Sequence, residues 1–219
     1  MTVATVLLLV VAGVAAGLAG SIAGLASLFS YPALLAVGLP ATSANVTNTV
    51  ALAFSTLGAV AGSRPELAGQ GARARQFGAV SLVGGAVGAG LLLGTPSGVF
   101  ARVVPFLVGG ASVVLLISGR AGRPVSAAPA GILADPNLQT GPPHRPLLVG
   151  AAVFAVSVYG GYFGAAAGVL MLALLTTMLP ETLVRANGLK NVLLGLANVI
   201  AAVGFSVFGP VSWQSVLPL

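Results

Sequence analysis

Long apolar segments alternate with short breaks along the whole chain. Gly and Pro residues divide the apolar sequence, and we expect eight of its segments to be helical. Two polar stretches, at 63–75 and 120–145, interrupt the series. The expected helical segments are 3–19, 22–38, 42–62, 76–94, 99–119, 147–160, 163–179 and 187–208.

Four long stretches of the sequence carry no charged side chain. The chain is uncharged before Arg64 and between Arg75 and Arg102. The other two stretches are 146–180 and 191–219, and each of the four exceeds the ~20 residues that a helix needs to cross a membrane. Only 5% of the 219 residues are charged, whereas soluble domains carry about 25%. The pattern therefore predicts an all-α, polytopic transmembrane helical bundle surrounded by lipid.

The cysteine count, the N-terminal residues and the net charge exclude several kinds of site and segment. There are no cysteines, so disulfides, zinc–thiolate sites and thiol nucleophiles are absent. Residues 1–29 lack a basic start, and their apolar run continues beyond that of a signal peptide, so we expect them in the mature protein. The net charge of +6 comes from basic residues scattered over loops and helix ends. We expect it to set orientation in the membrane rather than to bind nucleic acid.

The two halves of the chain share an order of motifs. Shifts of 140 to 142 residues superpose glycines, a proline and an Ala-Asn pair in the same order. An internal duplication of this kind is a common construction in secondary transporters. The superposed pairs are Gly20 with Gly160, Gly24 with Gly164, Pro40 with Pro180 and Asn45 with Asn187.

The duplication predicts the domain organisation. We expect a first transmembrane repeat over 1–119, a Pro-rich cytoplasmic linker over 120–145 and a second transmembrane repeat over 146–219. The second repeat is expected to be incomplete. In the first half 74 residues follow Asn45 up to Gly119, whereas only 32 follow Asn187 in the second half.

The first apolar stretch indicates how the halves are oriented. Residues 3–38 would form a helix of about 54 Å, which is too long for one ordinary crossing. Glycines near 17–24 are expected to break it into a hairpin of two short spans or a re-entrant pair. Each half then has an odd number of spans, so the two repeats are inverted. The three polar loops that hold seven of the nine basic residues then share one side. The positive-inside rule places that side in the cytoplasm and the N-terminus outside the cell (inner or plasma) membrane.

Two stretches resemble a known family of membrane transporters. GLAGSIAGLASLFSYPALLAVGLPATSANVTNTVAL (17–52) is similar to the opening of the sulfite exporter TauE/SafE family. YGGYFGAAAGVLMLALLTTMLPETLVRANGLKNVLLGLANVIAA (159–202) resembles the start of that family's second half. The resemblance implies a permease of inverted repeats that moves sulfite, sulfonates or related small organosulfur anions.

Amide side chains recur near the start of the third and the last apolar segments. Amides inside hydrocarbon cost several kcal/mol when unpaired, so they need partners from the protein or from a ligand. Helix–helix hydrogen bonding or helix capping is the structural alternative. Each motif follows a proline, and a helix start there would offer N–H groups and a positive dipole end to an anion. We expect the two helix starts to face one another near the midplane. The predicted substrate-binding residues are Asn45, Thr47, Asn48, Asn187, Lys190 and Asn191.

A lysine and several glycines are further candidates. Lys190 is the only charged residue between Asn187 and the C-terminus, and a cation in a membrane segment indicates function unless it snorkels to the interface. The glycines fall at helical spacing, which indicates either small-residue packing faces or a helix break beside the substrate path. The expected helix-break and packing residues are Gly20, Gly24, Pro40, Gly160, Gly164, Gly168 and Pro180.

The ionisable residues argue against an enzyme. The three carboxylates, Glu66, Asp135 and Glu181, are assigned to loops or segment ends, and His144 lies in the linker. No acid–base pair, metal cluster or nucleophile triad can be assembled from them. We therefore expect no enzymatic activity, no cofactor and no metal.

The scarcity of carboxylates and histidines also limits how transport could be coupled to an energy source. Proton coupling commonly uses a carboxylate or a histidine inside the membrane, and none is evident. An inside-negative potential drives anions outward by ~2.3 kcal/mol per charge and 100 mV, so the expected function is potential-driven anion export. The alternatives are a non-transporting membrane scaffold or assembly protein and a channel-like pore. A packed apolar interior would favour the scaffold. The sequence leaves the oligomeric state, including a homo-oligomer, open.

Overall fold

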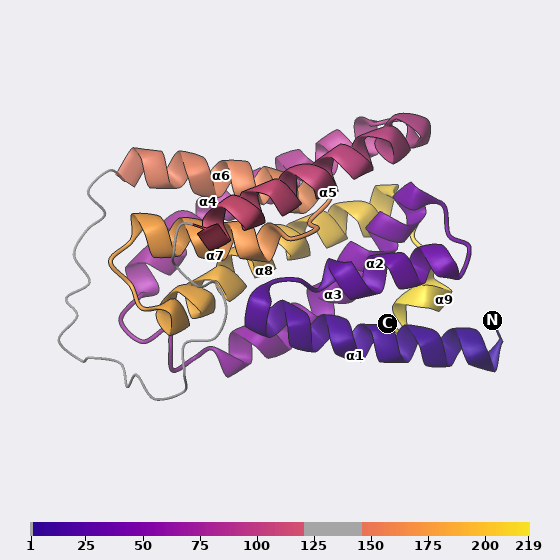
Figure 1. The fold of residues 1–219 in the computed structure, drawn as a ribbon, viewed down its shortest axis with the longest axis horizontal. Coiled ribbons are helices and arrows are strands. Elements are labelled where there is room, and N and C mark those ends of the chain that lie inside the picture. The colour runs from indigo at the N-terminus through magenta and orange to yellow at the C-terminus, as the bar shows by residue number, and fades with distance from the viewer. Residues whose placement is uncertain (1, 121–145) are drawn as a thin grey trace.

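The protein is a bundle of α-helices. The computed structural model describes residues 2–120 and 146–219, and it contains no strand within them. Asp135, His144 and all of the predicted linker after Arg120 lie outside the described residues. Each of the eight expected segments corresponds to a helix, which confirms the all-α prediction (Figure 1). The helices are α1 (Val3–Ala23), α2 (Ser27–Ala36), α3 (Ala41–Gly62), α4 (Gly71–Gly94), α5 (Ser97–Arg120), α6 (Pro146–Tyr162), α7 (Ala167–Met178), α8 (Leu183–Phe208) and α9 (Trp213–Val216).

The surface is apolar where a soluble protein would be polar. Leu7 and Leu18 on α1 and Val207 on α8 are more than half exposed, whereas Asn45 and Lys190 are each 1% exposed. Apolar side chains outside and polar side chains inside suit a lipid environment. In the part of the chain that is described, α1, α3, α4 and α8 are long and apolar enough to cross a membrane. The protein is therefore a multi-pass membrane protein.

The first segment of each half is broken into a hairpin, as the sequence predicts. The helix α1 ends at Gly24 with φ +74°, and α6 ends just before Gly164 with φ +73°. This left-handed conformation favours glycine and turns the chain back into α2 and α7. Both turns lie near the middle of the long axis of the molecule (Figure 1). The break therefore falls at the glycine pair that the 140-residue shift superposes.

The two halves run in opposite directions. In Figure 1, α1 and α3 run from right to left, whereas α6 and α8 run from left to right. The α3–α4 and α7–α8 connections lie at the left end, and the N-terminus and α9 lie at the right end. The inverted arrangement of the repeats is therefore confirmed, and two of the basic polar loops share one end as expected.

Helix α4 of the first half packs against two helices of the second half. It packs on both α6 and α8. A Cβ atom on Gly85 would lie 2.6 Å from the Cα atom of Ala197, and one on Gly88 would lie 2.1 Å from the carbonyl oxygen of Val158. Small residues allow this close approach of backbones, as is common between membrane helices.

An ionic cluster joins the halves at the left end of the bundle. The Glu181 side chain is 3% exposed, and its carboxylate accepts hydrogen bonds from Arg73 and, at 2.8 Å, from Arg185. The Gln70 amide donates to the carbonyl oxygens of Glu66 and Arg185. The cluster fixes the start of α4 against the α7–α8 connection. Glu66 and Glu181 thus lie in connections between helices, as predicted.

Candidate functional site

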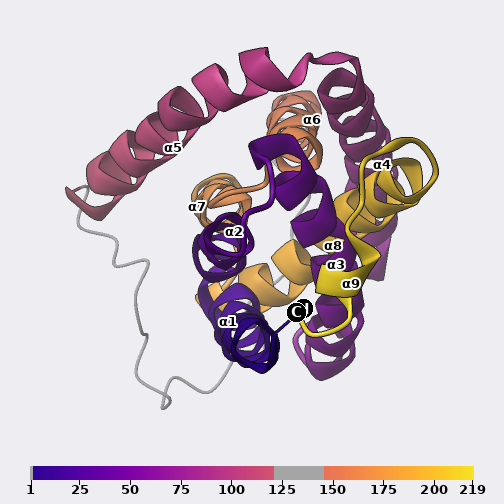
Figure 2. The same ribbon diagram turned by 90° about the vertical axis from the view of Figure 1, so that its right-hand side faces the viewer.

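The two hairpin turns meet tip to tip in the interior. A Cβ atom on Gly24 would lie 2.4 Å from the Cα atom of Gly168, and one on Gly168 would lie 2.3 Å from that of Gly24. The short helices α2 and α7 lead away from this contact towards opposite ends of the bundle (Figure 1), and their ribbons are drawn next to one another in the view along the bundle (Figure 2). Their N-terminal ends, which carry partial positive charge, therefore both lie near the centre.

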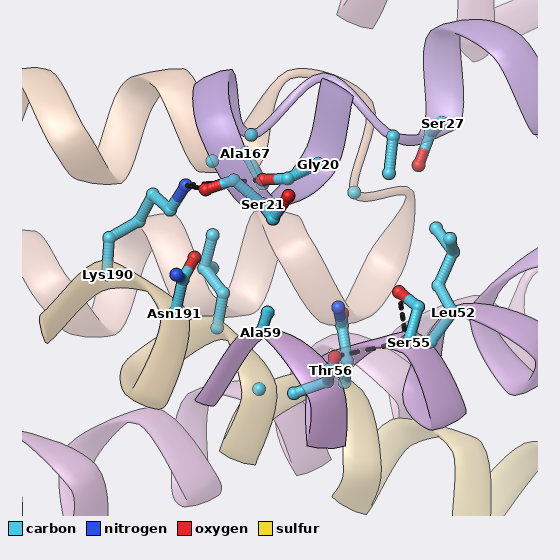
Figure 3. A pocket seen from close by; sticks show the side chains of 17 residues that line it. Gly20, Ser21, Ser27, Leu52, Ser55, Thr56, Ala59, Ala167, Lys190 and Asn191 are labelled. Carbon is cyan, nitrogen blue, oxygen red and sulfur yellow. Dashed lines mark hydrogen bonds between the residues drawn. The ribbon is translucent and has the colours of Figure 1, made fainter. Parts of the chain in front are cut away.

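A cavity of about 80 Å³ lies beside these turns, against α3 and α8 (Figure 3). Glycine, serine, threonine and asparagine form much of its wall, and Lys190 is the one charged residue among those that line it. The lining residues are Gly20, Ser21, Gly24, Ala26, Ser27, Leu52, Ser55, Thr56, Ala59, Gly164, Ala167, Gly168, Lys190, Asn191, Leu194, Gly195 and Asn198.

Lys190 projects from α8 towards the end of α1. Its Nζ atom donates to the carbonyl oxygens of Gly20, at 3.3 Å, and Ser21, at 3.5 Å (Figure 3). These carbonyls belong to the last turn of α1, where the helix dipole is negative and favours a cation. An ammonium has three donors, so one N–H remains for a ligand in the cavity. The side chain is 1% exposed, which excludes snorkelling to the interface.

The two asparagines that the internal duplication superposes, Asn45 and Asn187, each bond the hairpin of the opposite half. Asn45 is the fifth residue of α3, and its amide donates to the carbonyl oxygen of Tyr162 at the end of α6, at 3.0 Å. Asn187 is the fifth residue of α8, and its amide donates to the carbonyl oxygen of Ser21 in the last turn of α1, at 3.2 Å. Each long helix thus caps the broken helix of the other half. Both amide nitrogens thus make hydrogen bonds between helices.

The expectation that the two motif-bearing helix starts face one another is wrong. Helix α3 begins at the right end of the bundle and α8 at the left end (Figure 1), because inversion of the repeats separates them. The helix starts that share the cavity are those of α2 and α7, which follow the glycine turns, since Ser27 and Ala167 both line it. The sequence pattern indicated positive dipole ends at α3 and α8, whereas the helix starts at the cavity belong to the preceding helices, α2 and α7.

The remaining predicted residues divide between the cavity and its surroundings. Lys190 and Asn191 line the cavity; the Asn191 amide donates to the Ser63 hydroxyl at 2.8 Å. Asn48 lies behind the cavity and donates to the lining residue Ser27 at 3.1 Å. The remaining member of the first motif lies apart: the Thr47 hydroxyl accepts a hydrogen bond from the backbone of Ser212 at 3.0 Å.

A wider opening of about 560 Å³ adjoins the cavity. Ser21, Ser55, Ala59 and Asn191 line both spaces. The opening is bounded by the ends of α1 and α3 and by the start of α8, which includes Asn187. It therefore leads from the cavity towards the end of the bundle that holds the α3–α4 connection (Figure 1).

Several lining residues did not emerge from the sequence. Ser27, Ser55, Thr56 and Asn198 are polar members of the cavity wall. A helical face was the available signal, because Asn191 and Asn198 are seven residues apart and so lie on one side of α8. Single serines and threonines in apolar helices carry a weaker signal, since Ser55 and Thr56 also bond backward to the Leu52 carbonyl oxygen.

The glycines and prolines predicted to break or pack helices have identifiable places. A Cβ atom on Gly20 would lie 2.8 Å from that of Ala26, so Gly20 allows the tight turn of the first hairpin. Gly160 is less constrained, because a Cβ atom there would meet its nearest neighbour at 3.5 Å. Pro40 is the N-cap residue of α3, and Pro180 lies in the α7–α8 connection. Within the described ranges no group of three His, Cys, Asp or Glu side chains could hold a metal.

Comparisons with known proteins agree with this architecture. Searches of curated proteins and of solved structures gave no match. A model of the sulfite exporter TauE/SafE family matches residues 9–219, which is nearly the whole chain. The protein therefore belongs to the sulfite exporter TauE/SafE family of membrane transporters.

Proposed function

We propose that this protein is a permease that carries sulfite, sulfonates or related small sulfur oxyanions out across the cell membrane. The observation that supports it best is the buried ammonium of Lys190 in the cavity that the starts of α2 and α7 also line. The family match supports the class of substrate. A cation buried inside a membrane bundle is costly, and its retention favours a functional role.

The cavity suits a small oxyanion in charge and in size. Lys190 supplies a charge-assisted donor, and no carboxylate is among the described residues that line the cavity. Its volume of about 80 Å³ is several times the ~10–15 Å³ that one water molecule needs. The Ser27 hydroxyl accepts from Asn48, so its own proton can be donated to an oxyanion.

The wider opening gives the proposed direction. It faces the end of the bundle where the basic residues Arg64, Arg73, Arg75 and Arg185 are found in or beside the connections. The positive-inside rule assigns this end to the cytoplasm and the N-terminus to the outside. The site is then open to cytoplasmic anions, which the membrane potential drives outward by ~2.3 kcal/mol per charge and 100 mV.

The scaffold alternative predicts a packed apolar interior. The polar wall of the cavity, with Ser21, Asn191 and Asn198 beside Lys190, argues for transport instead. A channel-like pore would need an opening at both ends of the bundle. The opening lined by Ser21 and Asn191 extends to one end, which favours a carrier.

Flux through purified protein tests the proposal. Proteoliposomes with an imposed potential are loaded with labelled sulfite or methanesulfonate, and efflux is compared for the wild type, Lys190→Gln and Arg102→Gln. Arg102 is an exposed basic residue of α5 outside the cavity lining, so its variant controls for the loss of one charge. We expect potential-dependent efflux that falls at least tenfold in Lys190→Gln only. Absence of flux for every sulfur oxyanion would reject the transport function, and unchanged flux in Lys190→Gln would reject the site.

Cysteine labelling tests the direction. The natural chain has no cysteine, so single cysteines can be added without background. Gly58 lines the wider opening and Gly98 lies at the start of α5, and a Cβ atom at either would contact nothing within 4 Å. An impermeant maleimide should label Gly58→Cys in inside-out vesicles and Gly98→Cys in right-side-out cells. The reverse pattern would show that the cavity opens to the outside and would contradict export.

A further inference from the structure

Among the described residues that line the cavity, Lys190 is the one that carries a formal charge. Helices α1, α2, α3 and α7, which form most of its wall, have no Asp, Glu, Lys, Arg or His. On α8 the other charged residue is Arg185, whose guanidinium is paired with Glu181 at the end of the bundle. Glu66, in the α3–α4 connection, packs its Cβ atom near Gly188 but lines neither space. Lys190 is therefore the one countercharge available to a ligand in the described part of the cavity.

A second negative charge on the ligand would have no partner there. A monoanion and the Lys190 ammonium form a neutral pair in a site walled by helices, whereas a dianion leaves one charge uncompensated in a low dielectric. The carbonyl oxygens of Gly20 and Ser21 lie beside the ammonium. These oxygens carry the negative end of the α1 dipole and would repel the excess charge.

The hydroxyl groups of the wall point to the same choice. Ser55 and Thr56 donate their protons to the Leu52 carbonyl oxygen, at 3.2 and 3.0 Å. Each then presents only lone pairs to the cavity. These lone pairs can accept the proton of hydrogen sulfite, whereas the sulfite dianion and sulfate bring no proton to them. The lining groups thus include donors, namely the Lys190 ammonium, the Ser27 hydroxyl and the amides of Asn191 and Asn198, and the Ser55 and Thr56 hydroxyls as acceptors.

We propose that this site selects singly charged sulfur oxyanions, namely hydrogen sulfite and the alkanesulfonates, over the sulfite dianion and sulfate. The inference rests on the proposed permease function and specifies the charge of its substrate. It predicts that sulfite is carried in its protonated form, with the proton crossing the membrane on the substrate. No titrating group of the protein is needed for that proton.

A pH series separates the two ionic forms of sulfite. Efflux of sulfite is divided by efflux of methanesulfonate at the same pH and potential, which cancels the effect of titrating protein groups because methanesulfonate is a monoanion throughout. The ratio should fall about tenfold from one pH unit below the second pKa of sulfurous acid to one unit above it. A ratio that stays constant or rises would overturn the proposal. Absence of flux for both anions would instead reject the permease function.

Competition between anions of similar shape gives a second readout. Sulfate and methanesulfonate share a tetrahedral sulfur but differ by one charge. Methanesulfonate should inhibit labelled hydrogen sulfite efflux at a concentration at least tenfold lower than sulfate does. Equal inhibition by the two would overturn the selection by charge while leaving the permease function intact.

A variant with a second cation sharpens the test. Asn198 lines the cavity on the same helix as Lys190, and Asn198→Lys adds a positive charge where the dianion lacks one. Sulfate inhibition should be at least tenfold stronger in this variant than in the matched Asn198→Gln variant, which lengthens the side chain without adding a charge. If Asn198→Lys folds and sulfate inhibition does not strengthen, countercharge is not the basis of selection. If it fails to fold, the pH series and the anion competition on the wild type still decide the proposal.

Discussion

The asparagine motifs on the two long helices that follow the hairpins are built alike but differ by one charge. Asn45 on α3 and Asn187 on α8 occupy the fifth position of their helices and cap the broken helix of the opposite half. Three residues later the first half has Asn48 and the second has Lys190. Asn48 bonds a serine, whereas Lys190 places its ammonium at the cavity. The duplication therefore supplies two equivalent supports, and one substitution within it gives a single charged site.

The contact shared by both hairpins should be the most sensitive point. Gly24→Val or Gly168→Val forces a side chain into the opposite backbone, and Gly24 also has a positive φ. We expect a cost of about 3–5 kcal/mol, enough to abolish a monodisperse folded protein. Gly17→Val, in the same helix as Gly24 and with nothing within 4 Å of a Cβ atom, is the control. Size-exclusion chromatography in detergent measures the effect, and normal behaviour of both hairpin variants would refute the tip-to-tip contact.

The difference between the motifs can be removed with Lys190→Asn, which gives α8 the residue that α3 has at Asn48. Efflux of methanesulfonate should fall about a hundredfold, equivalent to ~2.7 kcal/mol, because the countercharge is lost. Asn48→Ala, at the equivalent position of the first half, should reduce efflux less than tenfold. Similar losses in the two variants would mean that both halves bind the anion equally.

The likeness between the motifs predicts equal effects for the two capping amides. Asn45→Ala and Asn187→Ala each remove one hydrogen bond to a helix end, which is worth about 0.6–2 kcal/mol in membrane proteins. The two variants should lower the thermal midpoint in detergent by similar amounts. A double variant should lose the sum of both effects, because the two bonds cap different helices. An unchanged thermal midpoint in either variant would show that the two hydrogen bonds do not contribute equally to stability.

The smallest effect is expected where the halves meet away from the site. The Ser81 and Ser157 hydroxyls form a buried hydrogen bond between α4 and α6, at 2.9 Å. Ser81→Ala should destabilise the protein by about 0.5–1.5 kcal/mol, and Ser157→Ala should add little once the partner is gone. Methanesulfonate efflux should be unchanged in both. A loss of efflux at normal stability would extend the functional region beyond the cavity.

Much of the fold follows from the sequence because hydrocarbon restricts the chain to helices. Apolar length and the glycines placed the segments, and the Gly24–Gly164 pair marked both hairpin turns. The inversion followed from the basic residues of the loops. The ends of the helices were less well predicted, since α8 begins at Leu183 rather than at 187. The Thr182 hydroxyl caps that start, a local contact that apolar patterning does not record.

The site was only partly predictable. Lys190 was singled out because a lone cation in an apolar segment needs a partner, and it lines the cavity. Asn45 was singled out by the same reasoning, but its amide is used to cap α6. Sequence alone does not separate these roles, because both relieve the cost of a polar group in lipid. Ser27 and Asn198 join the cavity through the meeting of the hairpins, which is a tertiary contact.

Protection of a cysteine by substrate tests most directly whether the cation of α8 binds the anion. Ser55 lines both the cavity and the wider opening, and Ser55→Cys gives a single thiol there. Methanesulfonate should slow maleimide labelling of this thiol in a concentration-dependent way. The half-protecting concentration should rise at least tenfold when Lys190→Asn is added and stay unchanged when Arg102→Gln is added. Equal protection with and without Lys190, or no protection in its presence, would contradict the account.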